Sequence, residues 1–364
     1  MYAPAIASAA QARRYDAVAP AVAIELTTSP SPHAWDDFVR GEPRASMYHL
    51  WGWRRVIEDT FGHETIYLAA TERGAISGVL PLTIFRSRIF GHFAVSLPFV
   101  DEAGICAANP AVSRMLEGCA ASIAASHHLS HVELRHVARQ SEELPVRQHK
   151  VGMSLRLVPD LGKAWTLLDR KVRNQIRKAE KSGLTERRGG AELLDGFYDV
   201  FCRNMRDLGT PVYPRRFFEH ILSTFPDTST IFVVEDPQRT PVAAGIGIVH
   251  HSLFAVPWAS SLREFRSQCP NTLLYWRMIE HAIASGLSTF NFGRSTPGEG
   301  TYLFKEQWGA RPTPLHWEYV LEQGRQLPDL TPKNPKFRAA IAAWKRLPVP
   351  VTRWLGPHII RSIP

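Results

Sequence analysis

The chain is poor in cysteine, with four among its 364 residues. They lie 13, 83 and 67 residues apart, and none of these spacings is that of a metal clip or a disulfide framework. We therefore expect reduced, buried thiols in a cytoplasmic protein. No histidine signature accompanies any of them, so a cysteine nucleophile is not predicted. The four residues are Cys106, Cys119, Cys202 and Cys269.

Long hydrophobic runs are also missing. No stretch approaches the 18 apolar residues that a membrane-spanning helix needs. The first residues have no basic start followed by an apolar block, so they lack the pattern of a signal peptide, and residues 1–21 are predicted to form a flexible tail. We expect a cytoplasmic protein, with peripheral association at the inner membrane as an alternative.

Several signatures of nucleotide-binding and hydrolytic sites are absent. The sequence contains no Walker loop, no dinucleotide fingerprint and no Gly-x-Ser-x-Gly nucleophile elbow. A local group of four histidines lacks the spacing of a zinc site, so we expect surface histidines and no metal. These are His127, His128, His131 and His136.

Acidic residues are missing from the end of the chain. Residues 331–364 contain seven Lys or Arg and no Asp or Glu, and the net charge of +9 falls to +2 without them, with 36 basic against 34 acidic residues. Phe337, Ile341 and Trp344 recur there at helical spacing. Residues 326–364 are therefore predicted to form a basic amphipathic tail, which docks on an anionic membrane surface or packs on its own domain.

The rest of the chain alternates predicted strands and helices in two halves of similar order. Its length exceeds what one ordinary core can fill. The tripeptide Phe93-Ala94-Val95 recurs 161 positions later as Phe254-Ala255-Val256, within the same succession of elements. We predict an α/β (α+β) protein with two related domains, residues 22–150 and 151–325, each a sheet flanked by helices.

The second half holds a stretch suited to a functional site. Residues 288–292 alternate as in a strand, Gly293 ends it, and a loop rich in Gly and Pro follows. Residues 301–308 then have the spacing of a short aromatic and basic helix. A strand end, a polar loop and a helix start together favour a site at this place, although the same stretch could be a connector with buried aromatics.

Two earlier segments carry charges that could serve such a site. A helix predicted over 164–182 carries a stripe of arginines and lysines that suits phosphates, if it is more than a solvated face. Asp207 and Tyr213 flank a turn after the next predicted helix. Asp207 could accept a proton from an amine, or could only pair with a neighbouring arginine.

Four motifs in this half resemble the FemAB-related branch of the GNAT acyltransferase superfamily. They are Arg173-Asn174-x-Ile176-Arg177-Lys178-Ala179, Leu208-Gly209-Thr210-Pro211, Asn291-Phe292-Gly293-Arg294 and Phe304-Lys305-x-x-Trp308-Gly309. The resemblance spans roughly residues 22–322. The chain is similar in particular to the FemAB-like proteins found with exosortase (PEP-CTERM) and exopolysaccharide systems.

This resemblance implies tandem GNAT-like domains, each with a mixed sheet, and an active site in the second. The reaction would transfer an acyl or aminoacyl group to an amine of a cell-envelope or exopolysaccharide precursor, such as a phosphorylated sugar. No cofactor would be bound permanently, and the donor would be acyl-CoA or aminoacyl-tRNA. The donor would lie where parallel strands at 252–260 and 288–292 separate, facing the next helix start. Residues 266–271 lack the usual coenzyme A loop, as Fem-type transferases that use aminoacyl-tRNA also do.

The resemblance further implies roles for single residues. Tyr302 would donate a proton to the leaving group, Lys305 would hold donor phosphate or ribose, and Asp207 is the third catalytic candidate. Arg173 and Arg177 would contact a phosphorylated acceptor. The full set expected to bind substrates is Arg173, Asn174, Arg177, Lys178, Tyr213, Trp258, Asn291, Gly293, Arg294 and Trp308.

Two alternatives to this function remain open. The first is a peptidoglycan-type peptidyl transferase that depends on aminoacyl-tRNA. The second is a catalytically inactive GNAT-like module that binds a glycan or a partner protein of a membrane-associated export system.

Overall fold

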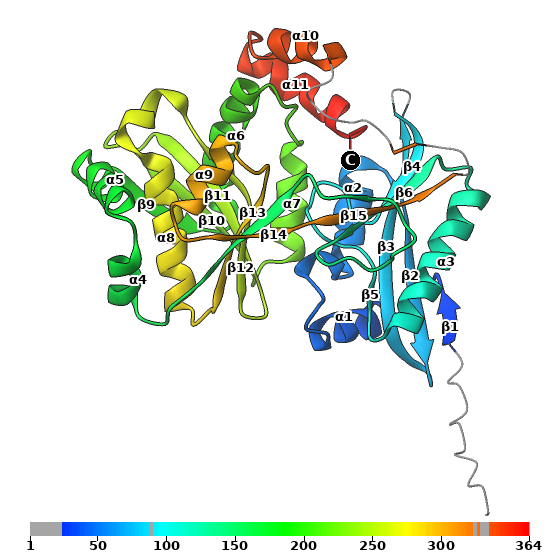
Figure 1. Ribbon diagram of the computed structural model, residues 1–364. Helices are drawn as coiled ribbons and strands as arrows, with labels where there is room; N and C mark the ends of the chain where they lie inside the picture. The colour runs from blue at the N-terminus through cyan, green and yellow to red at the C-terminus, as the bar shows by residue number, and fades with distance from the viewer. Residues whose placement is uncertain (1–23, 88–89, 323–325, 328–334, 364) are drawn as a thin grey trace, which may run out of the picture.

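The computed structural model describes residues 24–87, 90–322, 326–327 and 335–363, which form two α/β units side by side (Figure 1). Each unit is built on one mixed β-sheet. The tail predicted at residues 1–21 lies outside the described residues, as do residues 328–334 of the predicted C-terminal tail.

The first unit contains an eight-stranded sheet in the order β1-β2-β3-β4-β6-β15-β7, with β5 paired to β3. Among the described strands of this sheet only β4 and β6 run parallel. The strands are β1 (Ile24–Thr27), β2 (Glu64–Glu72), β3 (Ala75–Ser87), β4 (Gly91–Val95), β5 (Cys106–Ala107), β6 (His131–His136), β7 (Val146–Arg147) and β15 (His316–Leu321). The helices are α1 (Pro32–Gly41), η1 (Met47–His49), α2 (Gly52–Phe61) and α3 (Pro110–Ser126).

The second unit contains a seven-stranded sheet in the order β14-β8-β13-β12-β11-β10-β9. Here β12 and β13 are the parallel pair among the described strands. The strands are β8 (Val151–Arg156), β9 (Thr185–Gly189), β10 (Ser229–Glu235), β11 (Pro241–His250), β12 (Leu253–Ser261), β13 (Thr289–Ser295) and β14 (Arg311–Pro314). The helices are α4 (Leu161–Leu167), α5 (Arg170–Lys181), η2 (Ala191–Leu193), α6 (Leu194–Leu208), α7 (Arg215–Thr224), η3 (Arg263–Gln268), α8 (Pro270–Ala284) and α9 (Gly300–Glu306).

The predicted relation between the two units is confirmed by their parallel strand pairs. The repeated Phe-Ala-Val tripeptide lies on β4 in the first unit and on β12 in the second. Ala94 pairs with Val132 of β6, and Phe254 pairs with Phe290 of β13. In both units a helix, α3 or α8, connects the two parallel strands, as a parallel pair requires.

The two units share a hydrophobic core. Helices α6 and α7 cover the face of the second sheet that is turned toward the first unit, and α5 and α8 pack in a separate cluster against the same sheet. At the boundary, the ring of Phe61 lies 4.6 Å from that of Phe99 and 5.4 Å from that of Phe217. Because aromatic burial of this kind dominates packing energy, the units form one body and not two loosely linked domains.

Three expectations from the sequence differ from the structure. The helix predicted over 164–182 is two helices, because Leu168 is buried in an extended conformation and the Asp169 carboxylate then caps α5 at the Lys171 amide. The strand β15, which follows the second sheet in sequence, pairs with β6 and β7 of the first sheet. Two of the supposed surface histidines, His131 and His136, are buried.

Physical reasons for these burials are visible in the first sheet. The ring of His131 stacks on Phe93 at 5.1 Å, and His136 pairs through Nδ1 with the fully buried carboxylate of Glu318 on β15. The cysteines are all free thiols; Cys106 and Cys202 are buried, whereas Cys119 and Cys269 are half-buried.

The chain ends in two helices, α10 (Pro335–Trp344) and α11 (Val349–Ile360). Helix α11 packs on α6, and its residues Thr352, Gly356 and Ile360 are buried. Arg353 forms an ion pair with Asp199 at 2.9 Å. Among the helices that the structure describes, none is both long and apolar enough to cross a membrane.

Candidate functional site

The site begins where the parallel strands β12 and β13 separate. They pair only over Leu253–Ala255 and Thr289–Asn291. Directly beyond, β12 has an extra residue relative to β11 between Ala255 and Trp258, and Pro257 within this bulge has no backbone N–H to donate. A matching irregularity in β13 follows Asn291. The two bulges lie at one level and end the pairing of the strands, as the family resemblance implied.

The bulge in β13 is fixed by its own side chains. The Asn291 side chain accepts a hydrogen bond from the Gly293 amide at 2.7 Å, and Gly293 has a φ of +73°, a conformation that favours glycine. The Lys305 ammonium, from α9, donates to the carbonyls of Gly293 at 3.0 Å and Arg294 at 2.8 Å. Lys305 therefore holds the strand end, whereas the sequence had suggested contact with donor phosphate or ribose.

Lys305 is buried, with 7% of its surface exposed. This burial lowers the pKa of its ammonium from 10.5 to about 8, and the positive charge of Arg294 acts in the same direction against the opposing carboxylate of Asp101. Burying the Lys305 ammonium destabilises the folded chain. Its two hydrogen bonds to carbonyls and the nearby Asp101 carboxylate offset this cost.

A loop of the first unit closes the gap between the strands. Asp101, which lies between β4 and β5, accepts a hydrogen bond from the Arg294 amide at 2.9 Å and pairs with its guanidinium at 3.3 Å. That guanidinium lies 5.4 Å from the ring of Trp317 on β15. The gap itself is small, about 20 Å³, and Tyr48, Asp101 and Glu102 of the first unit contribute to its lining.

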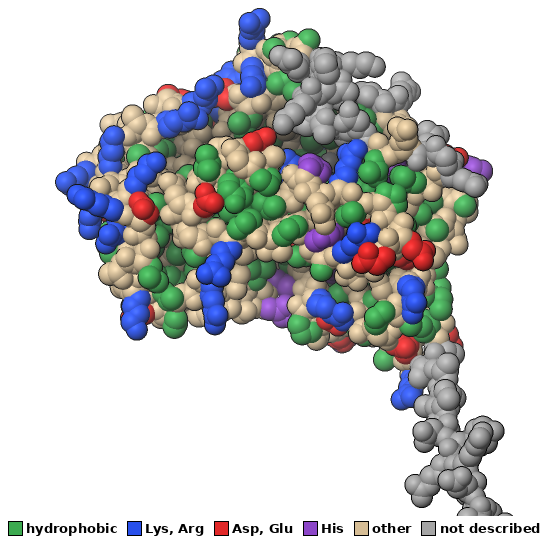
Figure 2. All heavy atoms as spheres, in the orientation of Figure 1, with side chains coloured by type: hydrophobic (Ala, Val, Ile, Leu, Met, Phe, Trp, Pro, Cys, Tyr) green, Lys and Arg blue, Asp and Glu red, His purple; other side chains and the backbone are tan. Residues whose placement is uncertain are grey.

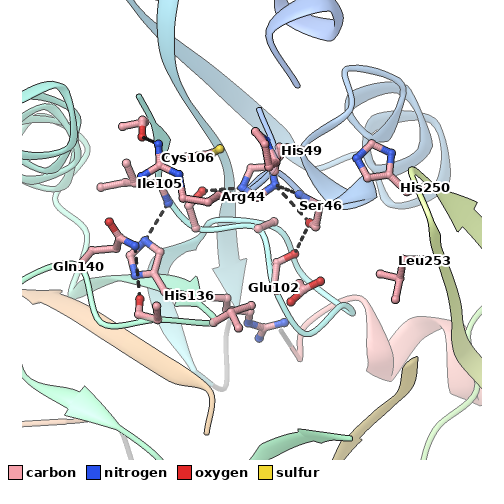
Figure 3. A pocket seen from close by; sticks show the side chains of 18 of the residues that line it. Arg44, Ser46, His49, Glu102, Ile105, Cys106, His136, Gln140, His250 and Leu253 are labelled. Carbon is pink, nitrogen blue, oxygen red and sulfur yellow. Dashed lines mark hydrogen bonds between the residues drawn. The ribbon is translucent and has the colours of Figure 1, made fainter. Parts of the chain in front are cut away.

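A larger cavity of about 430 Å³ adjoins this gap and lies between the units (Figure 3). The first unit supplies most of its wall, including His49, His136 and Glu102, and the second unit supplies His250 and Leu253 opposite them. Histidine side chains are visible along the seam between the units in Figure 2. Sequence reasoning missed the residues from the first unit; the adjacent carboxylates Asp101 and Glu102, in the loop between β4 and β5, carry no motif that would have found them.

The basic helix α5 lies along α8 in the same direction. The Thr272 hydroxyl donates to Gln175 at 3.2 Å, and Arg277 pairs with Glu180 at 2.8 Å. The start of α5 therefore lies beside the start of α8, and the Nε of Arg173 is buried there without a hydrogen-bond partner among the described residues. A helix start attracts anions, and Figure 2 shows Lys and Arg gathered at this edge of the second unit.

The other residues predicted on α5 are more exposed. The Arg177 guanidinium lies 5.4 Å from the ring of Trp165 on α4. Asn174 and Lys178 line an open depression on the surface of α5, together with Arg170 and Lys171.

Helix α9 and the turn after it place Tyr302 and Trp308, respectively, against the second core. Tyr302 is half-buried, and burial together with the nearby Glu306 raises the pKa of its phenol. Trp308 is buried 6.3 Å from Phe292, and its indole N–H has no hydrogen-bond partner among the described residues. Trp258, on β12 beyond its bulge, is buried against Phe217 and Phe218.

The turn residues Asp207 and Tyr213 are not brought together at the gap. Asp207 pairs with Arg206 at 2.6 Å and lines a surface pocket beside α11, so its placement matches the alternative of a simple ion pair. The Tyr213 ring packs 5.3 Å from Phe99, where the charges of Arg294 and Asp101 influence its phenol. Burial raises the pKa of that phenol.

In the described part of the chain, no group of three or more His, Cys, Asp or Glu is arranged to hold a metal ion. The polar groups at the gap are instead carboxylates, phenols and cations, which suit proton transfer and the binding of charged substrates.

Comparison with known proteins identifies the fold. Residues 168–306 match the family described as Acetyltransferase (GNAT) domain, and this segment contains α5, β12, α8, β13 and α9. The chain has a tandem GNAT fold. Search of the curated proteins finds no match.

Solved structures show the same fold along most of the chain. FemX superposes with a TM-score of 0.65 at 15% identity, covering 82% of this chain and 98% of FemX. A tandem GNAT protein from the clavulanic acid biosynthesis pathway gives 0.51 at 10% identity, covering 84% and 100%. The C-terminal domain of a putative lysylphosphatidylglycerol synthetase from Agrobacterium fabrum gives 0.53 at 12% identity, covering 79% and 91%.

Proposed function

We propose that this chain is an N-acyltransferase that moves an acyl or aminoacyl group from an activated donor to an amine. The observation that carries the proposal is the separation of β12 and β13 beside the start of α8, inside the segment that matches a GNAT domain. Diverging strands leave room and backbone groups for the carbonyl of a donor, and the helix start favours donor phosphates.

The donor end of the site is supported by the basic surface of α5. The sequence suggested that Arg173 and Arg177 hold a phosphorylated acceptor, but α5 lies beside the start of α8. In our proposal these arginines therefore face the phosphates of the donor. Arginine suits phosphate through bidentate hydrogen bonds, and the buried, unpaired Nε of Arg173 is a donor that such a ligand would satisfy.

In the proposed reaction the neutral amine attacks the acyl carbon directly, without a covalent enzyme intermediate. Tyr302 gives its phenolic proton to the leaving sulfur or oxygen. Lys305 keeps the β13 bulge in shape through the Gly293 and Arg294 carbonyls, so its contribution is to position the strand. Trp258, Asn291 and Trp308 shape the walls of the site.

The donor is acyl-CoA or aminoacyl-tRNA, and the acceptor is an amine of a cell-envelope or exopolysaccharide precursor. Residues 266–271 form η3 and the entry to α8, where Cys269 has a φ of +60° and provides no side-chain cap. This segment departs from the usual coenzyme A loop. That departure and the likeness to FemX keep a peptidyl transferase that uses aminoacyl-tRNA as the alternative.

Peripheral contact with an anionic membrane forms part of the proposal. On α11, Trp354, 69% exposed, and Val351 lie on the face opposite the buried Thr352, Gly356 and Ile360. The other face packs on the second unit. Exposed tryptophan with basic neighbours suits a lipid surface, and the helix can make both contacts at once.

The experiment that tests the proposal is a transfer assay with the purified chain. Acetyl-CoA, palmitoyl-CoA and alanyl-tRNA serve as donors, and glucosamine 6-phosphate and a lysine-containing peptide serve as acceptors. We expect transfer from one class of donor, and that donor should raise the melting temperature. Tyr302→Phe should lower kcat about 10²-fold or more. Stabilisation by none of the donors, with no transfer, would favour an inactive binding module.

A further inference from the structure

The loop at residues 96–105 is held rigidly at the boundary between the units. Arg135, on β6, donates to the carbonyls of Val100 at 2.7 Å and Leu97 at 3.3 Å, and its own carbonyl accepts hydrogen bonds from two amides at the end of the loop. The indole of Trp317 donates to the Asp101 carbonyl at 3.2 Å. A loop fixed on both sides can hold one side chain in a defined place, as catalysis requires.

Glu102 is the side chain that this loop places at the junction of the two voids. It lines the gap between β12 and β13 and also the cavity of about 430 Å³ between the units. In Figure 3 the hydrogen bond drawn to Glu102 ends on its backbone carbonyl, which accepts from Ser46, and no dashed line reaches its carboxylate. Within the described ranges no group donates a hydrogen bond to this carboxylate. The side chain is half-buried, so a ligand in the cavity can reach its carboxylate and donate a proton to it.

The other reactive groups of the cavity are occupied or unsuited. The ring of His49 accepts from the Ser46 amide at 3.0 Å and contacts the Gly104 carbonyl at 2.9 Å with its other nitrogen. His136 accepts from the Ile105 amide at 2.8 Å and pairs with Glu318, so both of its nitrogens are used. Neither ring is free to take a proton from a ligand.

His250 and Cys106 also line the cavity, but neither side chain is suited to act as the base. His250 lines the cavity but not the gap, and burial lowers its pKa to about 4, so it is a weak base. Burial raises the pKa of the Cys106 thiol to about 12, which leaves it protonated and unreactive. Glu102 is therefore the group with both the position and the chemistry.

The surroundings of Glu102 bring the pKa of its carboxyl close to neutral pH. Burial raises the pKa of its carboxyl from 4.5 to about 7, and the neighbouring Asp101 carboxylate acts in the same direction. A base works best when its pKa lies near the working pH. The titratable and charged groups that line the gap or the cavity with it are Asp101 on its own loop, Arg44 before η1, Tyr48 and His49 on η1, Cys106 on β5, Arg135 and His136 on β6, His250 on β11 and His251 after it.

We propose that Glu102 is the general base of the transfer reaction, and that the acceptor enters from the cavity between the units as a primary ammonium. This inference rests on the proposed function. The carboxylate of Glu102 takes one proton from the ammonium, and the freed electron pair of nitrogen forms the bond to the acyl carbon. The bond from that carbon to the sulfur or oxygen of the donor then breaks. The leaving atom takes a proton from Tyr302, and the second proton released by nitrogen restores the phenol.

The test compares the wild-type chain with Glu102→Gln, Glu102→Asp and the control Glu143→Gln, which alters an exposed carboxylate of the first unit. The assay uses the donor and acceptor on which the wild-type chain is active. For the wild type, kcat/KM should rise with pH through a midpoint near 7. Glu102→Gln should lose 10²- to 10⁴-fold in rate and lack this limb, while donor affinity and melting temperature stay close to those of the wild type. Glu102→Asp should restore part of the rate, and the control should match the wild type.

Failure of this inference differs from failure of the proposed function. If the wild type is active and Glu102→Gln keeps its rate within about threefold with the same pH profile, Glu102 is not the base. If the wild type transfers nothing, the proposed function fails instead. The infrared band of the protonated Glu102 carboxyl, from wild-type minus Glu102→Gln spectra, gives a readout without turnover. It should appear as the pH falls through about 7, and its appearance only below pH 5 would also overturn the inference.

Discussion

Replacing Lys305 by Met tests how the β13 end is held. The ammonium is buried, donates to the carbonyls of Gly293 and Arg294, and lies near the Asp101 carboxylate. Methionine has a similar volume and no charge, so Lys305→Met removes the charge and the two hydrogen bonds while largely filling the space. The hydrogen bonds and the burial of charge act in opposite directions, and pH separates them.

The size of the effect follows from the change in pKa. In the folded chain the pKa of Lys305 is about 8, and in the unfolded chain it returns to 10.5. Below pH 8 both states carry the proton, and the folded state bears the full cost of burying the charge. Between pH 8 and 10.5 the folded chain releases its proton while the unfolded chain keeps it, so stability rises with pH. The interval corresponds to roughly 3 kcal/mol in the free energy of unfolding.

The measurement is urea unfolding of wild type and Lys305→Met at several pH values from 7 to 10.5, followed by tryptophan fluorescence. The free energy of the wild type minus that of the variant should increase by about 3 kcal/mol across this range. Lys163→Met, an exposed lysine of α4, should show no such increase. A flat or falling difference for Lys305→Met would mean that the carbonyls and Asp101 stabilise the ammonium more than burial destabilises it, and our account of this residue would be wrong.

Three further changes test other parts of the structure. Gly293→Ala places a Cβ 3.4 Å from the Val256 carbonyl oxygen at a φ of +73°, which is unfavourable for alanine. Thermal unfolding should therefore show that the free energy of unfolding falls by about 1–2 kcal/mol, and the rate of transfer should fall. Unchanged stability would contradict the strained backbone at this bulge. Arg135→Met leaves the buried Glu133 carboxylate without its cation, so chemical denaturation should show that the free energy of unfolding falls by about 3–5 kcal/mol. A decrease below about 1 kcal/mol would contradict a stabilising role for this buried ion pair. Trp354→Glu should weaken flotation with phosphatidylglycerol vesicles, and equal flotation would remove the membrane contact.

The sequence predicted the second unit best where local chemistry determines structure. The strand expected at residues 288–292 is present, but β13 continues to Ser295, and Gly293, which was expected to end the strand, lies within its bulge at a φ of +73°. Helix α8 begins at Pro270, a position where proline is tolerated because it needs no backbone N–H there. The parallel pairing of β12 with β13 was implied by the family resemblance, and the structure shows it.

Roles that depend on distant contacts were not predictable in this way. Nothing local in the sequence shows that the Lys305 ammonium reaches back to two carbonyls 11 and 12 residues earlier. Asp207 lies in the last turn of α6 and lines a pocket beside α11 instead of the gap. Asp101 and Glu102 have no distinctive motif, and their proximity to β13 arises only when the first unit packs against the second.

The same packing explains why two units are needed for one site. After β14 the chain leaves the second sheet, passes the gap at Leu315 and enters the first sheet as β15. There Glu318 pairs with His136, and Trp317 contacts both Arg135, at 4.5 Å, and Arg294, at 5.4 Å. This crossing strand fixes the loop that carries Asp101 and Glu102 against the diverging strands of the other unit. The second unit alone would have the gap without a base, and the first would have the base without a gap, so the proposed chemistry depends on β15 holding the two together.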